Sequence, residues 1–126
     1  MSNEISVTAK IDVINGYLED RRNLSNFKIT QDAVGGNGGI QSIGTAAGGE
    51  TIVMGDVSTK GWAWFRNIEA AGGNYVDIGL QVSGTFYPLA KLEPGEPAMF
   101  RINNAATVYA RADTGAVNLL YMVLED

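Results

Sequence analysis

The chain has 126 residues, 45% of them hydrophobic, with a formal net charge of −5 and neither cysteine nor histidine. This length fits one domain with a substantial core, and the missing cysteine and histidine exclude disulfides, thiolate chemistry and the usual zinc sites. The 9 lysines and arginines are spread along an acidic chain, so no nucleic-acid-binding face is expected.

Residues 1–45 are predicted to form an N-terminal arm. Apolar and polar residues alternate over residues 5–13, which predicts a half-buried strand. Asn15-Gly16 then suits a hairpin turn. Residues 17–22 form either the returning strand or a loop, and residues 24–31 are predicted as a further strand.

The end of this arm is rich in glycine. The sequence GGNGG over Gly35–Gly39 predicts a flexible loop, because glycine holds regular structure poorly. Its spacing matches no phosphate-binding loop. A short strand near residues 40–43 and a second loop through Gly48-Gly49 are expected to follow.

Residues 46–126 are predicted to form the main sandwich of a single antiparallel β-sandwich domain that spans residues 1–126. From Glu50 onward, short alternating segments are separated by turn residues at a spacing typical of sandwiches and barrels. No credible amphipathic helix is found, so the fold class is all-β. The segments are ETIVMG, GWAWFRNIE, NYVDIGLQV, TFYPLAKL, PAMFRIN, ATVYARA and AVNLLYMVL.

Two segments carry apolar residues on both sides. In GWAWFRN, Trp62 and Trp64 share one strand face, and Ala63 and Phe65 share the other. We favour one face in the core and the other under a loop or a subunit; the alternative is an exposed tryptophan platform for a sugar. The last strand, residues 116–124, is either central or covered by another chain, and it is too short to span a bilayer.

No arrangement of residues supports an enzyme. Ser42 misses the G-x-S-x-G spacing by about one residue, and no histidine could activate it. A Ser–Lys pair or the carboxylates of Glu93 and Glu96 would be the remaining routes, and no local motif supports them. No calcium-binding loop pattern occurs. We therefore expect no catalytic residue, cofactor, metal site or membrane partner.

The run from about Ile43 to Asp126 resembles a class of small virion proteins of tailed bacteriophages. The resemblance lies in the succession GDV, GWAWFRN, NYVDIG, GTFYPL, LEPGE and YMVLED. It implies a jelly-roll-like β-sandwich that decorates or cements a capsid, or belongs to a tail or fibre. Such proteins often form trimers, and the resemblance brings no catalytic residues with it.

These expectations combine into one functional hypothesis. The chain would be a non-enzymatic structural protein of the virion, made in the host cytoplasm, and a homo-oligomer with a trimer favoured. Its partners would be its own copies and the major capsid protein or other virion proteins, with Tyr87, Met99 and Tyr109 as subunit contacts. The alternative is a carbohydrate-binding or receptor-binding module of a tail or fibre that uses Trp62 and Trp64.

Overall fold

The computed structural model describes residues 3–126 and divides into two compact units, one ending at Ala33 and the other spanning Val34–Asp126. Every regular element in the described range is a β-strand, and every strand pair is antiparallel. The predicted all-β antiparallel class is therefore confirmed. The expected arm boundary at residue 45 differs from the observed one, because the strand at Gly36–Ile43 pairs within the second unit.

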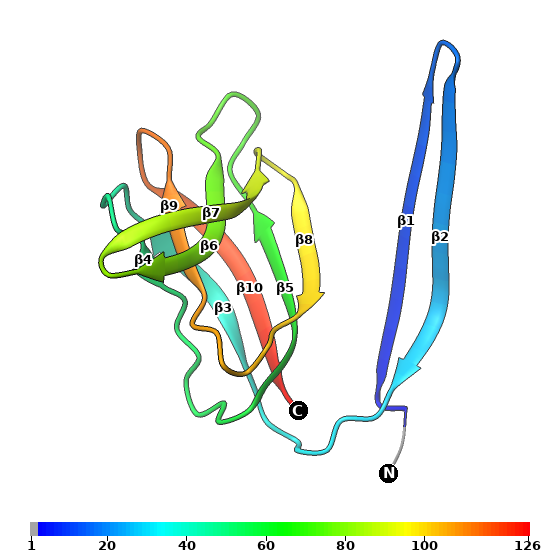
Figure 1. Ribbon diagram of the computed structural model, residues 1–126, viewed down its shortest axis with the longest axis horizontal. Helices are drawn as coiled ribbons and strands as arrows, with labels where there is room; N and C mark the ends of the chain where they lie inside the picture. The colour runs from blue at the N-terminus through cyan, green and yellow to red at the C-terminus, as the bar shows by residue number, and fades with distance from the viewer. Residues whose placement is uncertain (1–2) are drawn as a thin grey trace. The chain divides into compact units, whose positions relative to one another are not determined.

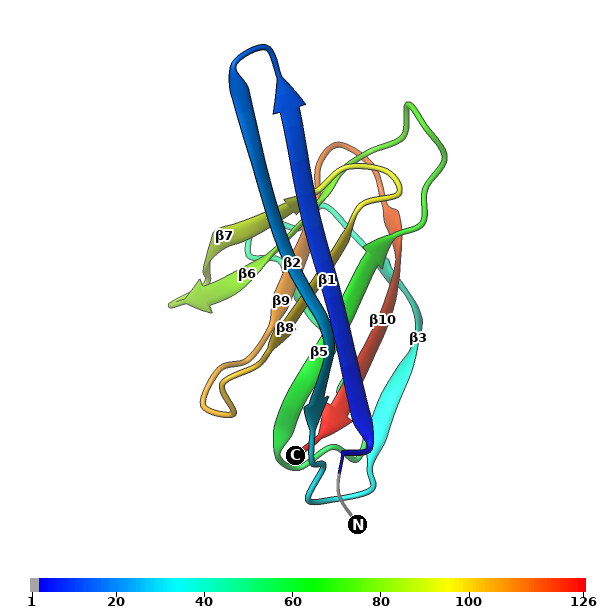
Figure 2. The ribbon, with the colours of Figure 1, turned by 90° about the vertical axis from the view of Figure 1, so that its right-hand side faces the viewer.

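The first unit is a long hairpin of β1 (Ile5–Asn15) and β2 (Leu18–Ile29), drawn in blue in Figures 1 and 2. Asn15 pairs with Leu18, which leaves a two-residue turn of Gly16 and Tyr17. Gly16 has φ +59°, which glycine adopts without steric cost at the first central position of a type II′ turn. Residues 17–22 thus belong to the turn and the returning strand, and β2 is continuous.

The second unit is a sandwich of two four-stranded sheets with the orders β3-β10-β5-β8 and β4-β9-β6-β7 (Figure 1). All seven segments predicted from Glu50 onward contain a strand. The strands are β3 (Gly36–Ile43), β4 (Glu50–Thr51), β5 (Lys60–Asn67), β6 (Val76–Val82), β7 (Thr85–Leu92), β8 (Pro97–Arg101), β9 (Tyr109–Ala112) and β10 (Val117–Glu125).

The strand pairs of the sandwich are nested around one tight turn. β6 pairs with β7, β5 with β8, β4 with β9, and β3 with β10, so the chain forms one long antiparallel ribbon distributed over two sheets. The central turn is Ser83-Gly84, where both residues have positive φ, as a type I′ hairpin turn requires. Two further pairings, β10 with β5 and β6 with β9, complete the sheets.

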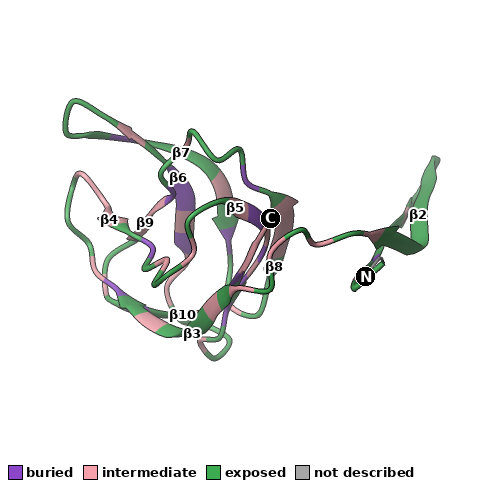
Figure 3. Ribbon diagram, turned by 90° about the horizontal axis from the view of Figure 1, so that it is seen from below, coloured by how far each residue is buried: buried purple, intermediate pink, exposed green. Residues whose placement is uncertain are grey.

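The core lies between the inner faces of the two sheets, and Figure 3 shows buried segments on strands such as β5 and β6. Phe65 is fully buried, and its ring centroid lies 5.5 Å from that of Phe100. β10 is a central strand, with Val117, Leu119 and Val123 fully buried. In this unit the apolar side of each alternating strand is buried, as the sequence predicts, because a second sheet packs against it.

The prediction of a flexible loop over Gly35–Gly39 is wrong, because Gly36–Gly39 form the first half of β3. A Cβ atom on Gly38 would lie 2.7 Å from the carbonyl oxygen of Tyr121, so the backbones approach more closely than a side chain allows. Gly39 has φ +147°, a value that glycine tolerates. These glycines permit the pairing with β10.

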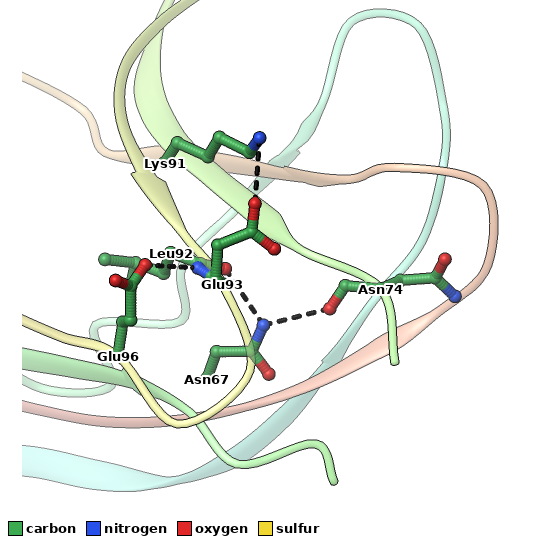
Figure 4. A network of polar contacts seen from close by, with 6 residues as sticks. All are labelled: Asn67, Asn74, Lys91, Leu92, Glu93 and Glu96. Atoms are coloured by element: carbon green, nitrogen blue, oxygen red, sulfur yellow. Dashed lines mark hydrogen bonds and ion pairs between the residues drawn. The ribbon is translucent and has the colours of Figure 1, made fainter. Parts of the chain in front are cut away.

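One buried polar side chain fixes an end of the sandwich (Figure 4). Asn67 is fully buried, and its Nδ2 donates hydrogen bonds of 3.0 Å to the carbonyl oxygens of Asn74 and Leu92. Its Oδ1 accepts a hydrogen bond of 3.0 Å from the backbone N–H of Glu69. The amide thus joins the end of β5 to the loop before β6 and to the end of β7, with its polar atoms satisfied.

Candidate functional site

The hairpin has one apolar and one polar face. Residues directly opposite one another in an antiparallel pair share a face, and the observed register places nine apolar side chains on the same side of β1 and β2. We call this side the hairpin face. Its residues are Ile5, Val7, Ala9, Ile11, Val13, Leu18, Leu24, Phe27 and Ile29.

A β-bulge in β2 brings both Leu24 and Phe27 to this face. Leu24 and Phe27 are three positions apart, so regular alternation would put them on opposite sides of the strand. The register shifts between them: Val7 pairs with Phe27, whereas Ala9 pairs with Leu24. Asn26 takes φ +53°, and its backbone N–H donates a 3.2 Å hydrogen bond to Oγ1 of Thr8. The bulge therefore turns both large side chains to the same side.

Most of the hairpin face is exposed, and Figure 3 colours most of β2 accordingly. The exposed fraction is 72% for Ile11, 58% for Leu18, 47% for Leu24 and 48% for Phe27. Within β1 and β2, Val7 is the only residue that is buried. The sequence predicts a half-buried strand here, and the structure gives the strand but leaves most of its apolar side exposed.

The opposite face of the hairpin is polar and carries charges of both signs. Lys10 and Asp12 form an ion pair of 3.1 Å, and Arg21 and Glu19 form one of 3.3 Å. Ile14, with 68% of its surface exposed, is an apolar exception on this side. Such exposed pairs contribute little to stability, and they suit a face that stays in water.

The sandwich has a second apolar face on the outside of the β3-β10-β5-β8 sheet. The strand register places seven large apolar side chains together there, and we call this the sheet face. Its residues are Ile40, Trp62, Trp64, Met99, Leu120, Met122 and Leu124. Ile40 is 62% and Met122 44% exposed, and the other five are half-buried. Gly36 and Gly38 add no side chains beside β10, which keeps the face flat.

The two tryptophans lie on this sheet face. Their neighbours Ala63 and Phe65 are buried in the core, as expected for one side of the strand. Trp64 is paired with both Met99 and Met122, and Trp62 with Arg101. The Nε1–H of Trp62 is buried and has no hydrogen-bond partner among the described residues. Cover of the indoles by a loop or a subunit, and their alternative use as a platform for a sugar, stay predictions.

The three predicted subunit contacts are not brought together on one sheet. Met99 belongs to the sheet face on β8, whereas Tyr87 on β7 and Tyr109 on β9 belong to the other sheet. Tyr87 is 56% exposed, and Met99 and Tyr109 are half-buried. The sequence did not single out Ile40 or the hairpin face as contacts, although it gave cover by another chain as one explanation for the last strand. The alternation of apolar and polar residues can be read in the sequence, but the strand register that groups these residues on one face cannot.

A polar cleft of about 250 Å³ lies on the other sheet, between Thr45, Tyr75, Asp77, Arg111 and Asp113. Burial raises the pKa of Asp77, an effect that Arg111 and Lys91 partly oppose. The negative charge of Asp113 raises the pKa of the Tyr75 hydroxyl. The ammonium of Lys91 lies 4.3 Å from the centre of the Tyr75 ring. Positive and negative groups balance here, as in a structural ion-pair network.

The carboxylates considered for catalysis have structural roles. The backbone N–H of Glu93 donates a 2.8 Å hydrogen bond to Oε1 of Glu96 across the turn between β7 and β8. Glu93 also forms a 2.9 Å ion pair with Lys91. Over residues 3–126, no group of three or more Asp or Glu side chains is placed to hold a metal ion. None of these residues forms a helix that could cross a lipid bilayer.

No family model, curated protein or solved structure matches the chain. The surfaces of this molecule are therefore the guide to its function, since a fold by itself does not fix a function.

Proposed function

We propose that this chain is a non-enzymatic structural protein that acts by assembling with other protein surfaces. The observation that carries the proposal is the hairpin face, an apolar surface that the hairpin cannot bury by itself. A single two-stranded hairpin is at best marginally stable in water. An extended hairpin with large exposed aliphatic and aromatic side chains is typical of a segment that is completed by a partner.

The finer proposal is that the assembly is a phage particle, in which the chain decorates or cements the capsid. It is supported by the resemblance of residues 43–126 to small virion proteins. The nested strand pairs also follow the strand order of a jelly roll, an architecture that occurs in viral capsid proteins, lectins and cupins. A virion role needs buried apolar area and strand pairing and does not need titrating groups.

Mass spectrometry of purified particles from the encoding phage or prophage tests this proposal. We expect the chain to be present at a stoichiometric ratio to the major capsid protein, and particles that lack it to release their DNA at a lower temperature. Its absence from highly purified particles would contradict the virion role and leave assembly elsewhere in the cell to be sought.

The position of Trp62 and Trp64 on the sheet face favours a second candidate, a carbohydrate-binding module. Indoles on a flat outer face are suited to stacking against sugar rings. Titration of the tryptophan fluorescence with glycans of the host cell surface tests it. A saturable change that is lost in Trp64→Ala and retained in Tyr87→Ala would support this function, and an unchanged spectrum with all glycans would argue against it.

A further inference from the structure

We infer that the occupant of the sheet face is the hairpin of a second copy of this chain, in a closed assembly where every copy gives one hairpin and receives one. This inference rests on the proposed assembly role and names its partner. Each chain carries two apolar faces, the hairpin face and the sheet face, and neither is covered within its own unit. Because each chain has one hairpin face and one sheet face, copies of the chain can cover both faces without another protein.

The two faces match in kind and in size. β1 has 11 residues, so the hairpin is about 36 Å long, and two strands give a width of about 10 Å. β10, in the middle of the sheet face, has 9 residues and is about 30 Å long. A two-stranded ribbon therefore fits along the central strands, and stacked sheets pack about 10 Å apart through such apolar side chains.

The buried area favours an exchange, in which each copy places its hairpin on the sheet face of the other, over a contact between two hairpins. A face of this length and width covers about 350 Å² in projection. Two hairpins packed face to face would bury about 700 Å², which is below the range of about 1,200–2,000 Å² found in stable interfaces. When two copies exchange hairpins with each other, the two contacts together bury about 1,400 Å² between the same two chains, which lies within that range.

The charges are compatible with this packing. Asp20 and Arg22, the charged residues on the apolar side of the hairpin, form an ion pair of 3.2 Å near its tip. Arg66 and Arg101 occupy the β5 and β8 rows of the sheet's outer side and are exposed, with Arg101 paired to Asp126. The Nε–H of Arg66 donates a hydrogen bond to the carbonyl oxygen of Gly95, so this charge has to stay in water at the edge of the contact. Apart from these charged residues, the parts of the two faces that would meet are apolar.

Sedimentation equilibrium of the full chain and its point variants tests the exchange. Ile11→Lys places a charge on the hairpin face, and Ile14→Lys makes the same change, at similar exposure, on the polar face of the same strand. We expect wild type to assemble, Ile11→Lys to weaken assembly at least about 100-fold, and Ile14→Lys to change it less than about 3-fold. Circular dichroism melting checks that the sandwich of each variant is folded.

The sheet face is tested in the same way. Met122→Glu and Ile40→Glu should both weaken assembly, whereas Leu89→Glu, an exposed position on the other sheet, should not. An equimolar mixture of Ile11→Lys and Met122→Glu should assemble more strongly than either variant alone, because each mixed pair keeps one contact between two unaltered faces, whereas an unmixed pair keeps none. Assembly of both sheet-face variants like wild type would overturn the exchange, as would equal effects of Ile11→Lys and Ile14→Lys.

The outcomes separate this inference from the proposed function. A wild-type chain that stays monomeric at every accessible concentration overturns the exchange, even if mass spectrometry finds it in particles. In that case a different virion protein covers the two faces. A chain that assembles as described but is absent from particles keeps the exchange and overturns the virion role.

Discussion

The hairpin and the sandwich are built from the same alternation of apolar and polar residues, and they differ in what lies against the apolar side. In the sandwich, β5 alternates strictly between buried and half-buried or exposed positions, because a second sheet packs on it. In β1 the same alternation leaves Ile11 72% exposed. Alternation therefore identifies the apolar side of a strand, and burial depends on a second layer that local sequence does not specify.

The largest expected difference in stability comes from replacing one phenylalanine in each region. Phe65→Ala should lower the free energy of unfolding by about 3–5 kcal/mol, because Phe65 is fully buried and leaves a cavity. Phe27→Ala, on the hairpin, should change the unfolding of the sandwich by less than about 0.5 kcal/mol in dilute solution. Urea denaturation, monitored by tryptophan fluorescence, measures both variants. Similar losses of unfolding free energy would show that the hairpin and the sandwich do not differ in burial.

A smaller effect is expected at Asn67, the polar side chain inside the sandwich. Asn67→Ala should cost about 3 kcal/mol, because it leaves the carbonyl oxygens of Asn74 and Leu92 without a donor in a buried site. Asn118→Ala is the matched control, since its side chain is exposed on β10. Thermal unfolding compares the two variants, and an unchanged melting temperature for Asn67→Ala would refute its role in joining the loops.

The glycines of β3 sharpen the comparison further, because they allow this strand to join the sandwich. Gly38→Ala should lose about 2 kcal/mol, since its Cβ would lie 2.7 Å from the carbonyl oxygen of Tyr121. Gly36→Ala should lose little, because its nearest neighbour lies at 3.4 Å. Equal stability of the two variants in urea would show that β3 adjusts easily and that close approach is not what requires glycine.

The smallest expected effect is on how the stability of the sandwich depends on pH. Hydrogen bonds from the hydroxyl and backbone N–H of Ser58 hold the pKa of Glu125 below its ordinary value of 4.5. Because the folded-state pKa is the lower one, this contact stabilises the sandwich above the unfolded pKa and is lost as pH falls through the folded value.

Glu125→Gln should therefore be less stable than wild type near neutral pH, and the difference should shrink in melting curves recorded from about pH 6 to about pH 3. Glu19→Gln, in an exposed ion pair of the hairpin, is the control and should leave the melting of the sandwich unaltered. A difference between wild type and Glu125→Gln that stays constant with pH would contradict the assignment to this carboxylate.

The sequence was sufficient for the strands and turns, and insufficient for what depends on pairing between distant residues. Alternation and turn residues such as Ser83-Gly84 predict the strands of the sandwich because these signals are local. A short strand near residues 40–43 was predicted, but its first half, Gly36–Gly39, was taken for a loop because these glycines are explained only by the approach of β10. The grouping of residues on the two faces was not predicted for the same reason, since it depends on the register and on the bulge before Phe27.

Hydrogen–deuterium exchange of the backbone amides, measured over a range of about 100-fold in protein concentration, tests the central claim most directly. The hairpin should be marginal by itself and become protected when a partner covers its face. We predict that amides of residues 5–29 gain protection as concentration rises, while those of β10 keep theirs throughout. Hairpin amides with the same protection at every concentration would contradict the account, because assembly would then not cover the hairpin.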